Sequence, residues 1–204
     1  DTGFNIVVGK LYHLAVTWNG SNYYVYVNGV SYTGGSGTAK VTLDSANDLY
    51  FGSSSGSSQF MNGVIDDVSL FNTTLSATEA IELFNDGVAL DATTHSKKDY
   101  LVGYWRNDGI SSWLDRTDIQ AVSFDGTGDN VRGGSNLDID LSEQWSVSLW
   151  FYRPTTGGST QIIFSNVKNS TNRMGIMINS NTLVISSYNG SAYNYVGSPS
   201  IGPV

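Results

Sequence analysis

The segment WSVSLWFY, residues 145–152, decides the fold class because its side chains alternate strictly along the chain. Successive side chains of an extended strand point to opposite faces, so every second residue shares a face. One of the two faces is apolar throughout, with Trp145, Val147, Leu149 and Phe151. The segment therefore predicts a β-strand that packs this face into a core.

The segment NYYVYVNG, residues 22–29, alternates in the same way and adds turn signals. It ends in Asn28-Gly29, which is typical of a type I′ hairpin turn because both central residues of that turn need a positive φ. The earlier pair Asn19-Gly20 predicts a turn between two antiparallel strands. Further strands are expected over residues 48–52, 63–71, 121–124, 160–167, 173–179, 182–188 and 192–196.

The composition agrees with many short strands joined by tight turns. Of 204 residues, 23 are glycine, 40% are hydrophobic and only 14% are charged, so a sizeable core is possible. The net charge of −8 argues against nucleic acid as a partner, because binding to phosphates needs a basic surface. No apolar run is long enough to span a bilayer, so we expect no membrane insertion. Cysteine is absent, which excludes disulfides and thiolate metal sites.

One helix is expected in this otherwise all-β chain. Ser76 and Glu79 have the spacing of a capping box, in which each side chain accepts a hydrogen bond from the backbone N–H of the other residue. The helix should run over residues 77–85 and stop at Gly87. Its expected role is structural.

The chain divides into a first half, residues 1–90, and a second half, residues 121–204. Between them, residues 91–120 mix polar residues with isolated aromatics. This pattern is typical of a connector that packs on domain surfaces.

Several motifs of the two halves resemble laminin-G-like jelly rolls of the concanavalin A-like lectin/glucanase superfamily. In the first half, YHLAVTWNGSNYYVYVNGV (12–30) and LYFGSSSGSSQFMNGVIDDVSLFNTTLSATEAIELF (49–84) are similar to the closing portion of such a domain. In the second half, VSFDGTGDNV (122–131) and LDIDLSEQWSVSLWFYRP (137–154) are similar to the opening portion. The resemblance implies an all-β fold, an antiparallel β-sandwich jelly roll with one short helix.

The order of these portions is inverted relative to the family. The chain is either a circular permutant or a junction in a tandem array, with the end of one repeat followed by the start of the next, and we favour the junction. The two halves are complementary. They could pair into one sandwich within a chain, or with copies of the same chain by strand complementation.

Glycoside hydrolysis is the first activity to consider, because the superfamily includes glucanases. It needs two carboxylates that flank the glycosidic bond. Asp138, Asp140 and Glu143 loosely resemble the glucanase motif, but the leading residue of that motif is Glu. An edge strand with solvated acids explains these residues equally well, so we expect no enzymatic activity and no catalytic residues.

Calcium is the cofactor that the resemblance implies, as a structural clamp between the first and last strands of some members. Its ligands here would be Asp66, Asp67, Asp125 and Asp129, since Ca²⁺ prefers oxygen ligands. The alternative is that the glycine-flanked aspartates 125 and 129 only form turns, while Asp66 and Asp67 are surface acids.

Sugar binding needs an aromatic platform with polar neighbours. The faces opposite the apolar ones carry Tyr24, Tyr26, Trp150 and Tyr152, which are the candidate ligand-binding residues. Aromatic residues of strands more often serve packing, which is the alternative role for these four.

Together these features predict a non-enzymatic binding or adhesion module of a larger repeat protein. We expect it to bind a glycan or a surface protein outside the cell, as part of a cell-surface adhesin or a phage or virion appendage. The main alternative is a purely structural, self-assembling virion or surface-layer repeat. A glycoside hydrolase is a distant alternative.

Overall fold

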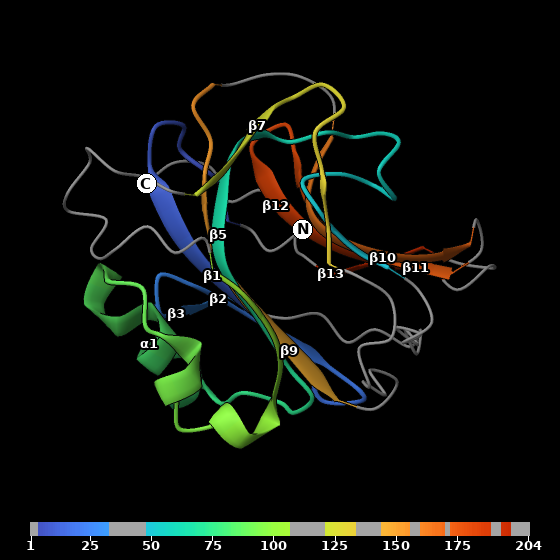
Figure 1. The fold of residues 1–204 in the computed structure, drawn as a ribbon. Coiled ribbons are helices and arrows are strands. Elements are labelled where there is room, and N and C mark those ends of the chain that lie inside the picture. The colour runs from blue at the N-terminus through green and yellow to red at the C-terminus, as the bar shows by residue number, and fades with distance from the viewer. Residues whose placement is uncertain are drawn as a thin grey trace.

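The computed structural model describes residues 4–32, 48–106, 121–133, 144–155, 160–169, 172–188 and 193–196. Two antiparallel sheets face each other across an apolar core, and helix α1 (Ala77–Phe84) lies on the outer side of one sheet (Figure 1). The predicted fold class, an antiparallel sandwich with one short helix, is therefore confirmed. No helix in the described part is both long and apolar enough to cross a membrane.

The first sheet runs, in spatial order within the described residues, β3 (Val30–Tyr32), β2 (Tyr23–Val27), β1 (Leu11–Trp18), β9 (Trp145–Tyr152), β5 (Asn62–Phe71) and β6 (Leu101–Trp105). Strand β7 (Val122–Asp125) also pairs with β5. The second sheet runs β13 (Tyr193–Val196), β12 (Thr182–Tyr188), β11 (Asn172–Asn179), β10 (Gln161–Asn169), β4 (Leu49–Phe51) and β8 (Val131–Arg132). Three short 3-10 turns follow the helix: η1 (Asn85–Gly87), η2 (Ala92–Thr94) and η3 (Lys98–Tyr100).

Strand β9 lies in the middle of the first sheet and pairs along both edges. It runs antiparallel to β1, from Leu11 opposite Tyr152 to Trp18 opposite Trp145, and antiparallel to β5 on its other side. The face that the alternation assigned to the core is fully buried. The sandwich thus interleaves strands of the two halves, since β10 of the second half also pairs with β4 of the first.

The two predicted Asn-Gly turns take different forms. Asn28 and Gly29 have φ of 49° and 74°, as a type I′ turn requires, and join β2 to β3. At Asn19 the side chain takes part in the turn. The Asn19 Oδ1 atom accepts hydrogen bonds from the backbone N–H groups of Ser21 and Asn22, at 3.0 and 2.8 Å. The Asn19 N–H also donates to the Asn22 carbonyl at 3.2 Å, so the backbone and the Asn19 side chain together close this hairpin.

The helix has the expected capping box and ends slightly earlier than expected. The Ser76 N–H donates to Glu79 Oε2 at 2.7 Å, and the Glu79 N–H donates to Ser76 Oγ at 3.3 Å. Asn85, in the left-handed conformation, caps the C-terminus, so the helix ends at Phe84 and Gly87 closes the following 3-10 turn. Asn85 takes this left-handed position two residues before Gly87, where the helix was expected to stop, because the short polar side chain of Asn also tolerates the conformation.

The expected connector, residues 91–120, contains a strand. Its residues 101–105 form β6, which extends the first sheet by pairing with β5. A five-residue strand with a central glycine is too short for the alternation to indicate it. The connector is thus partly built into the sandwich.

The segment around α1 covers the outer face of the first sheet. Ala80 packs on Ala15 and Tyr26, and the Phe84 ring stacks on Trp150, with 6.0 Å between the ring centroids. A buried polar network fixes the entry to the helix. The Leu75 N–H donates to Thr17 Oγ1 at 3.1 Å and to Ser146 Oγ at 3.0 Å, and Ser146 Oγ donates to the Thr73 carbonyl at 2.7 Å. Both faces of the first sheet are therefore covered near its centre.

The central position of β9 predicts a large cost for truncating its core face. Leu149 is fully buried, so Leu149→Ala should lower the free energy of unfolding by about 2–5 kcal/mol, through lost apolar contacts and a residual cavity. The control is Val30→Ala, at an edge-strand residue that is 57% exposed, which should change it by less than about 0.5 kcal/mol. Urea titrations measure both; equal effects would contradict the central placement of β9.

Candidate functional site

A cavity of about 300 Å³ lies at one edge of the first sheet, between β6 and β7. Both strands pair with the same edge of β5, β7 along residues 62–65 and β6 along residues 68–71. Asp66 and Asp67 fall between these two stretches and belong to neither ladder. The cavity therefore occupies a notch that the sheet leaves where one strand stops and the other begins.

An irregularity in β5 shapes this notch. Asp67 has a left-handed backbone, with φ of 47°, and the register between β5 and β9 shifts between Asp66 and Ser69. Irregularities of this kind bend a strand and redirect its side chains. The Asp66 Oδ1 atom accepts the Asp67 N–H at 2.8 Å, and Asp67 Oδ1 accepts the Tyr104 hydroxyl at 2.8 Å. The Asp67 carboxylate is thus hydrogen-bonded to Tyr104, while the Asp66 side chain lines the cavity.

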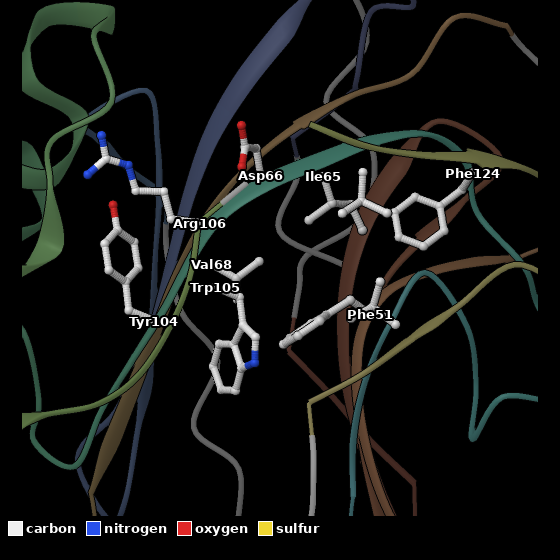
Figure 2. A pocket seen from close by; sticks show the side chains of 10 residues that line it. Phe51, Ile65, Asp66, Val68, Tyr104, Trp105, Arg106 and Phe124 are labelled. Atoms are coloured by element: carbon white, nitrogen blue, oxygen red, sulfur yellow. The ribbon is translucent and has the colours of Figure 1, made fainter. Parts of the chain in front are cut away.

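The walls of the cavity are mainly apolar and aromatic (Figure 2). The Trp105 ring meets the Phe51 ring edge-on, with 5.1 Å between centroids, so one residue of each sheet contributes to the lining. Gly103 makes room for the indole, because a Cβ atom at this position would lie 2.4 Å from the Trp105 ring. The remaining apolar lining consists of Ile65, Val68, Val122, Phe124 and Val131.

Polar groups gather on the opposite side, where Figure 2 shows the ends of Asp66, Tyr104 and Arg106. The Arg106 Nη1 atom donates to Asp91 Oδ2 at 2.8 Å, in an ion pair that stays partly exposed. Hydrogen bonds from Thr93, together with the Arg106 guanidinium, lower the pKa of Asp91. Burial, with the negative charge of Asp67, raises the pKa of Tyr104, which keeps its hydroxyl protonated as a donor.

The arrangement combines an aromatic surface with one lining carboxylate and one guanidinium. Apolar walls with a few directional polar groups are typical of small-molecule sites, and 300 Å³ is at the small end of such sites. An indole face packs against the C–H groups of a sugar ring, while a carboxylate and a guanidinium bind hydroxyl groups. The cavity is thus chemically suited to a single polar ring.

The four aromatic residues predicted to bind ligand lie away from this cavity. Tyr26 and Trp150 are 5% and 4% exposed because α1 covers them. Tyr24, at 37% exposure, and the half-buried Tyr152 remain accessible. Tyr26 and Trp150 therefore have a packing role in the structure, since alternation shows that residues share a face but not what covers it. Ligand binding by these four residues stays a prediction.

The four predicted calcium ligands do not converge. Asp125 is opposite Asn62 on β5, four residues from Asp66, which corresponds to roughly 13 Å along a strand. From the sequence, Asp66 and Asp67 were expected to lie close to Asp125 and Asp129. The register of β7 on β5 separates the two pairs.

The aspartates of the β7–β8 turn are engaged locally. Asp125 Oδ1 accepts the backbone N–H and the hydroxyl of Thr127, both at 2.7 Å, and Asp129 Oδ2 accepts the Asp125 N–H at 3.0 Å. These bonds lower the pKa of Asp125. Across the described ranges, no three His, Cys, Asp or Glu side chains are grouped so that they could hold a metal ion. Calcium binding stays a prediction from the resemblance.

The sequence analysis missed Trp105 and Arg106, because both belong to the stretch interpreted as a connector. The available signal was the run LVGYWR, residues 101–106, which joins β-prone and aromatic residues to a cation. The acidic residues considered for catalysis, Asp138, Asp140 and Glu143, lie outside the described residues.

Comparison with known families matches residues 1–80 to the model described as the concanavalin A-like lectin/glucanases superfamily. The superfamily includes both lectins and glucanases. Neither curated protein sequences nor solved structures gave a significant match. The resemblance seen in the first half is thus confirmed for residues 1–80.

His13 beneath α1 predicts a pH dependence of stability. It is 1% exposed, and burial lowers its pKa to about 3, against about 6.5 in an unfolded chain. The unfolded state therefore binds a proton first, and stability is lost as the pH falls below 6.5, by about 1.4 kcal/mol per unit from this residue until about pH 3. His13→Gln should remove this contribution.

Urea titrations of the wild type and of His13→Gln between pH 7 and pH 4 measure it. The glutamine is a neutral side chain that can still hydrogen-bond Ser148 Oγ, which lies 2.7 Å from His13 Nε2. Parallel stability curves for the two proteins would show that His13 is not buried in the neutral form.

Proposed function

We propose that the protein, whose residues 1–80 match the concanavalin A-like lectin/glucanases superfamily, is a non-enzymatic carbohydrate-binding module. Its binding site is the cavity between β6 and β7. The observation that carries the proposal is that the Trp105 indole lines this cavity together with Asp66 and Arg106.

In this proposal the Trp105 ring packs against one face of a sugar, and the polar groups select its hydroxyl pattern. Asp66 accepts hydrogen bonds from hydroxyl groups, and Arg106 donates to ring or hydroxyl oxygens. The ion pair of Arg106 with Asp91 holds the guanidinium in place. The binding energy would come chiefly from the aromatic contact, and the specificity from the polar groups.

The proposed absence of catalysis rests on the carboxylates at the cavity. Glycosidases use two carboxyl groups about 5–9.5 Å apart, one on each side of the scissile bond. Among the described residues that line the cavity, Asp66 is the single carboxylate, and neighbouring Asp67 is hydrogen-bonded to Tyr104. A lone carboxylate suits recognition better than hydrolysis.

We place such a module outside the cell, on a cell or virion surface, as an adhesion unit of a larger protein. The acidic, cysteine-free and turn-rich sequence supports this setting, and binding through a small cavity suits attachment to terminal sugars. A surface protein remains the alternative ligand.

A glycan array probed with the protein tests the proposal. We expect binding to a set of glycans that share one terminal sugar, and Trp105→Ala should weaken the affinity at least about tenfold through loss of the aromatic contact. The matched control is Tyr24→Ala, an accessible aromatic on β2 that does not line the cavity; its affinity should match the wild type. Circular dichroism verifies the fold of both.

Two outcomes would contradict the proposal. One is binding that survives in Trp105→Ala but is lost in Tyr24→Ala, which would move the site to the outer face of β2. The other is cleavage of the bound glycan with release of a reducing end that Asp66→Asn abolishes, which would make the protein a hydrolase.

A further inference from the structure

The strands β1 and β5 do not pair with each other, and between them they form a slot one strand wide. Strand β9 fills this slot, with eight residue pairs to β1 and six to β5. All three strands run in the middle of the first sheet (Figure 1). The first half of the chain therefore presents two strand edges that only a third strand can satisfy.

Besides pairing along both edges, β9 makes specific side-chain contacts on both of its faces. Toward the core, the apolar face of β9 is at most 1% exposed. Toward the helix, Ser148 Oγ lies 2.7 Å from His13 Nε2, and Ser146 Oγ accepts the Leu75 N–H and donates to the Thr73 carbonyl. The slot is thus specific for a strand with the alternation of β9, not for any extended segment.

The remaining strands of the second half also pair with strands of the first half or with one another. Strands β7 and β8 pair with β5 and β4, and β10 pairs with β4 and leads through β11 and β12 to β13. All contacts between the two halves are non-covalent except the chain path from Arg106 to Ala121.

That path is long for the distance it covers. Trp105 and Val122 pair with β5 residues only three positions apart, Val68 and Ile65, roughly 10 Å along a strand. The 14 residues 107–120 can extend over about 45 Å. The length of the chain therefore does not dictate which copy supplies the second half.

We propose that the partner of this protein is a second copy of itself, with residues 121–204 of one copy completing the sandwich of the other. Each sandwich of the exchanged pair keeps every contact described above, and only the path of residues 107–120 changes, which makes such an exchange inexpensive. A single chain closes on itself in dilute solution, because the effective concentration of its own second half is in the millimolar range. Exchange prevails where copies fold at high local concentration.

A pair of engineered cysteines tests this proposal directly, because the chain has none of its own. Leu11 and Tyr152 are directly opposite on β1 and β9, and both are half-buried. One variant carries Leu11→Cys and the other Tyr152→Cys. The two are unfolded, mixed at high concentration, refolded and oxidised.

We expect a disulfide-linked species of twice 22.0 kDa in the mixture, in a yield that rises with protein concentration. The double variant Leu11→Cys/Tyr152→Cys is the matched control; at low concentration it should close within one chain, which shows that the pair has a bondable geometry. Each single variant, refolded and oxidised alone, measures how much disulfide forms between two copies of the same cysteine. A mixture that stays monomeric at every concentration, while the double variant closes, would overturn the proposal.

Complementation of disabled chains gives a second, independent test. Leu14→Asp places a charge at a buried position of the first half, and Ile176→Asp places one at a buried position of the second half. Each variant alone should therefore lose the native near-ultraviolet circular dichroism signal. Refolded together, they can form one sandwich from two intact halves and should recover up to half of the wild-type signal. Leu14→Asp mixed with Leu70→Asp, both in the first half, should recover none; equal signals from the two mixtures would contradict the exchange.

Discussion

The structure depends on one constraint, that β9 pairs along both edges in the middle of the first sheet. Because side chains alternate, a one-residue slip would turn its apolar face toward the helix, so the register is strongly specified. Ser146 of this strand also anchors the chain that leads into α1. With one edge of β5 occupied by β9, the other edge carries β6 and β7, and the notch between them becomes the cavity.

The elements that could be predicted are those whose signal lies within a few residues. Alternation identified β2 and β9, the turn signal at Asn19-Gly20 indicated a strand before it that corresponds to β1, the spacing of Ser76 and Glu79 identified the capped helix, and Asn28-Gly29 identified a hairpin turn. The strand β6 could not be found this way. It is five residues long, and its place in the sheet comes from pairing with β5 residues that lie thirty or more positions away in the sequence.

The candidate site was harder to predict, because it depends on what covers a face and on the register between distant strands. Tyr26 and Trp150 were assigned to the correct face, yet the sequence does not state that α1 packs on it. The cavity takes Ile65 from the first half, Trp105 from the connector and Phe124 from the second half. A ligand at this position would report that the two halves have come together, within one chain or between two.

The position of β9 also governs what happens while the protein is being made. Its slot is complete once β5 has left the ribosome, but β9 follows about 75–80 residues later in the sequence. At 5–20 residues per second, that interval lasts roughly 4 to 16 s. During this time the nascent chain exposes the unpaired edges of β1 and β5. These edges can pair with β9 of another copy made on the same polysome. Translation speed, rather than final stability, therefore sets how long the chain is open to pairing outside itself.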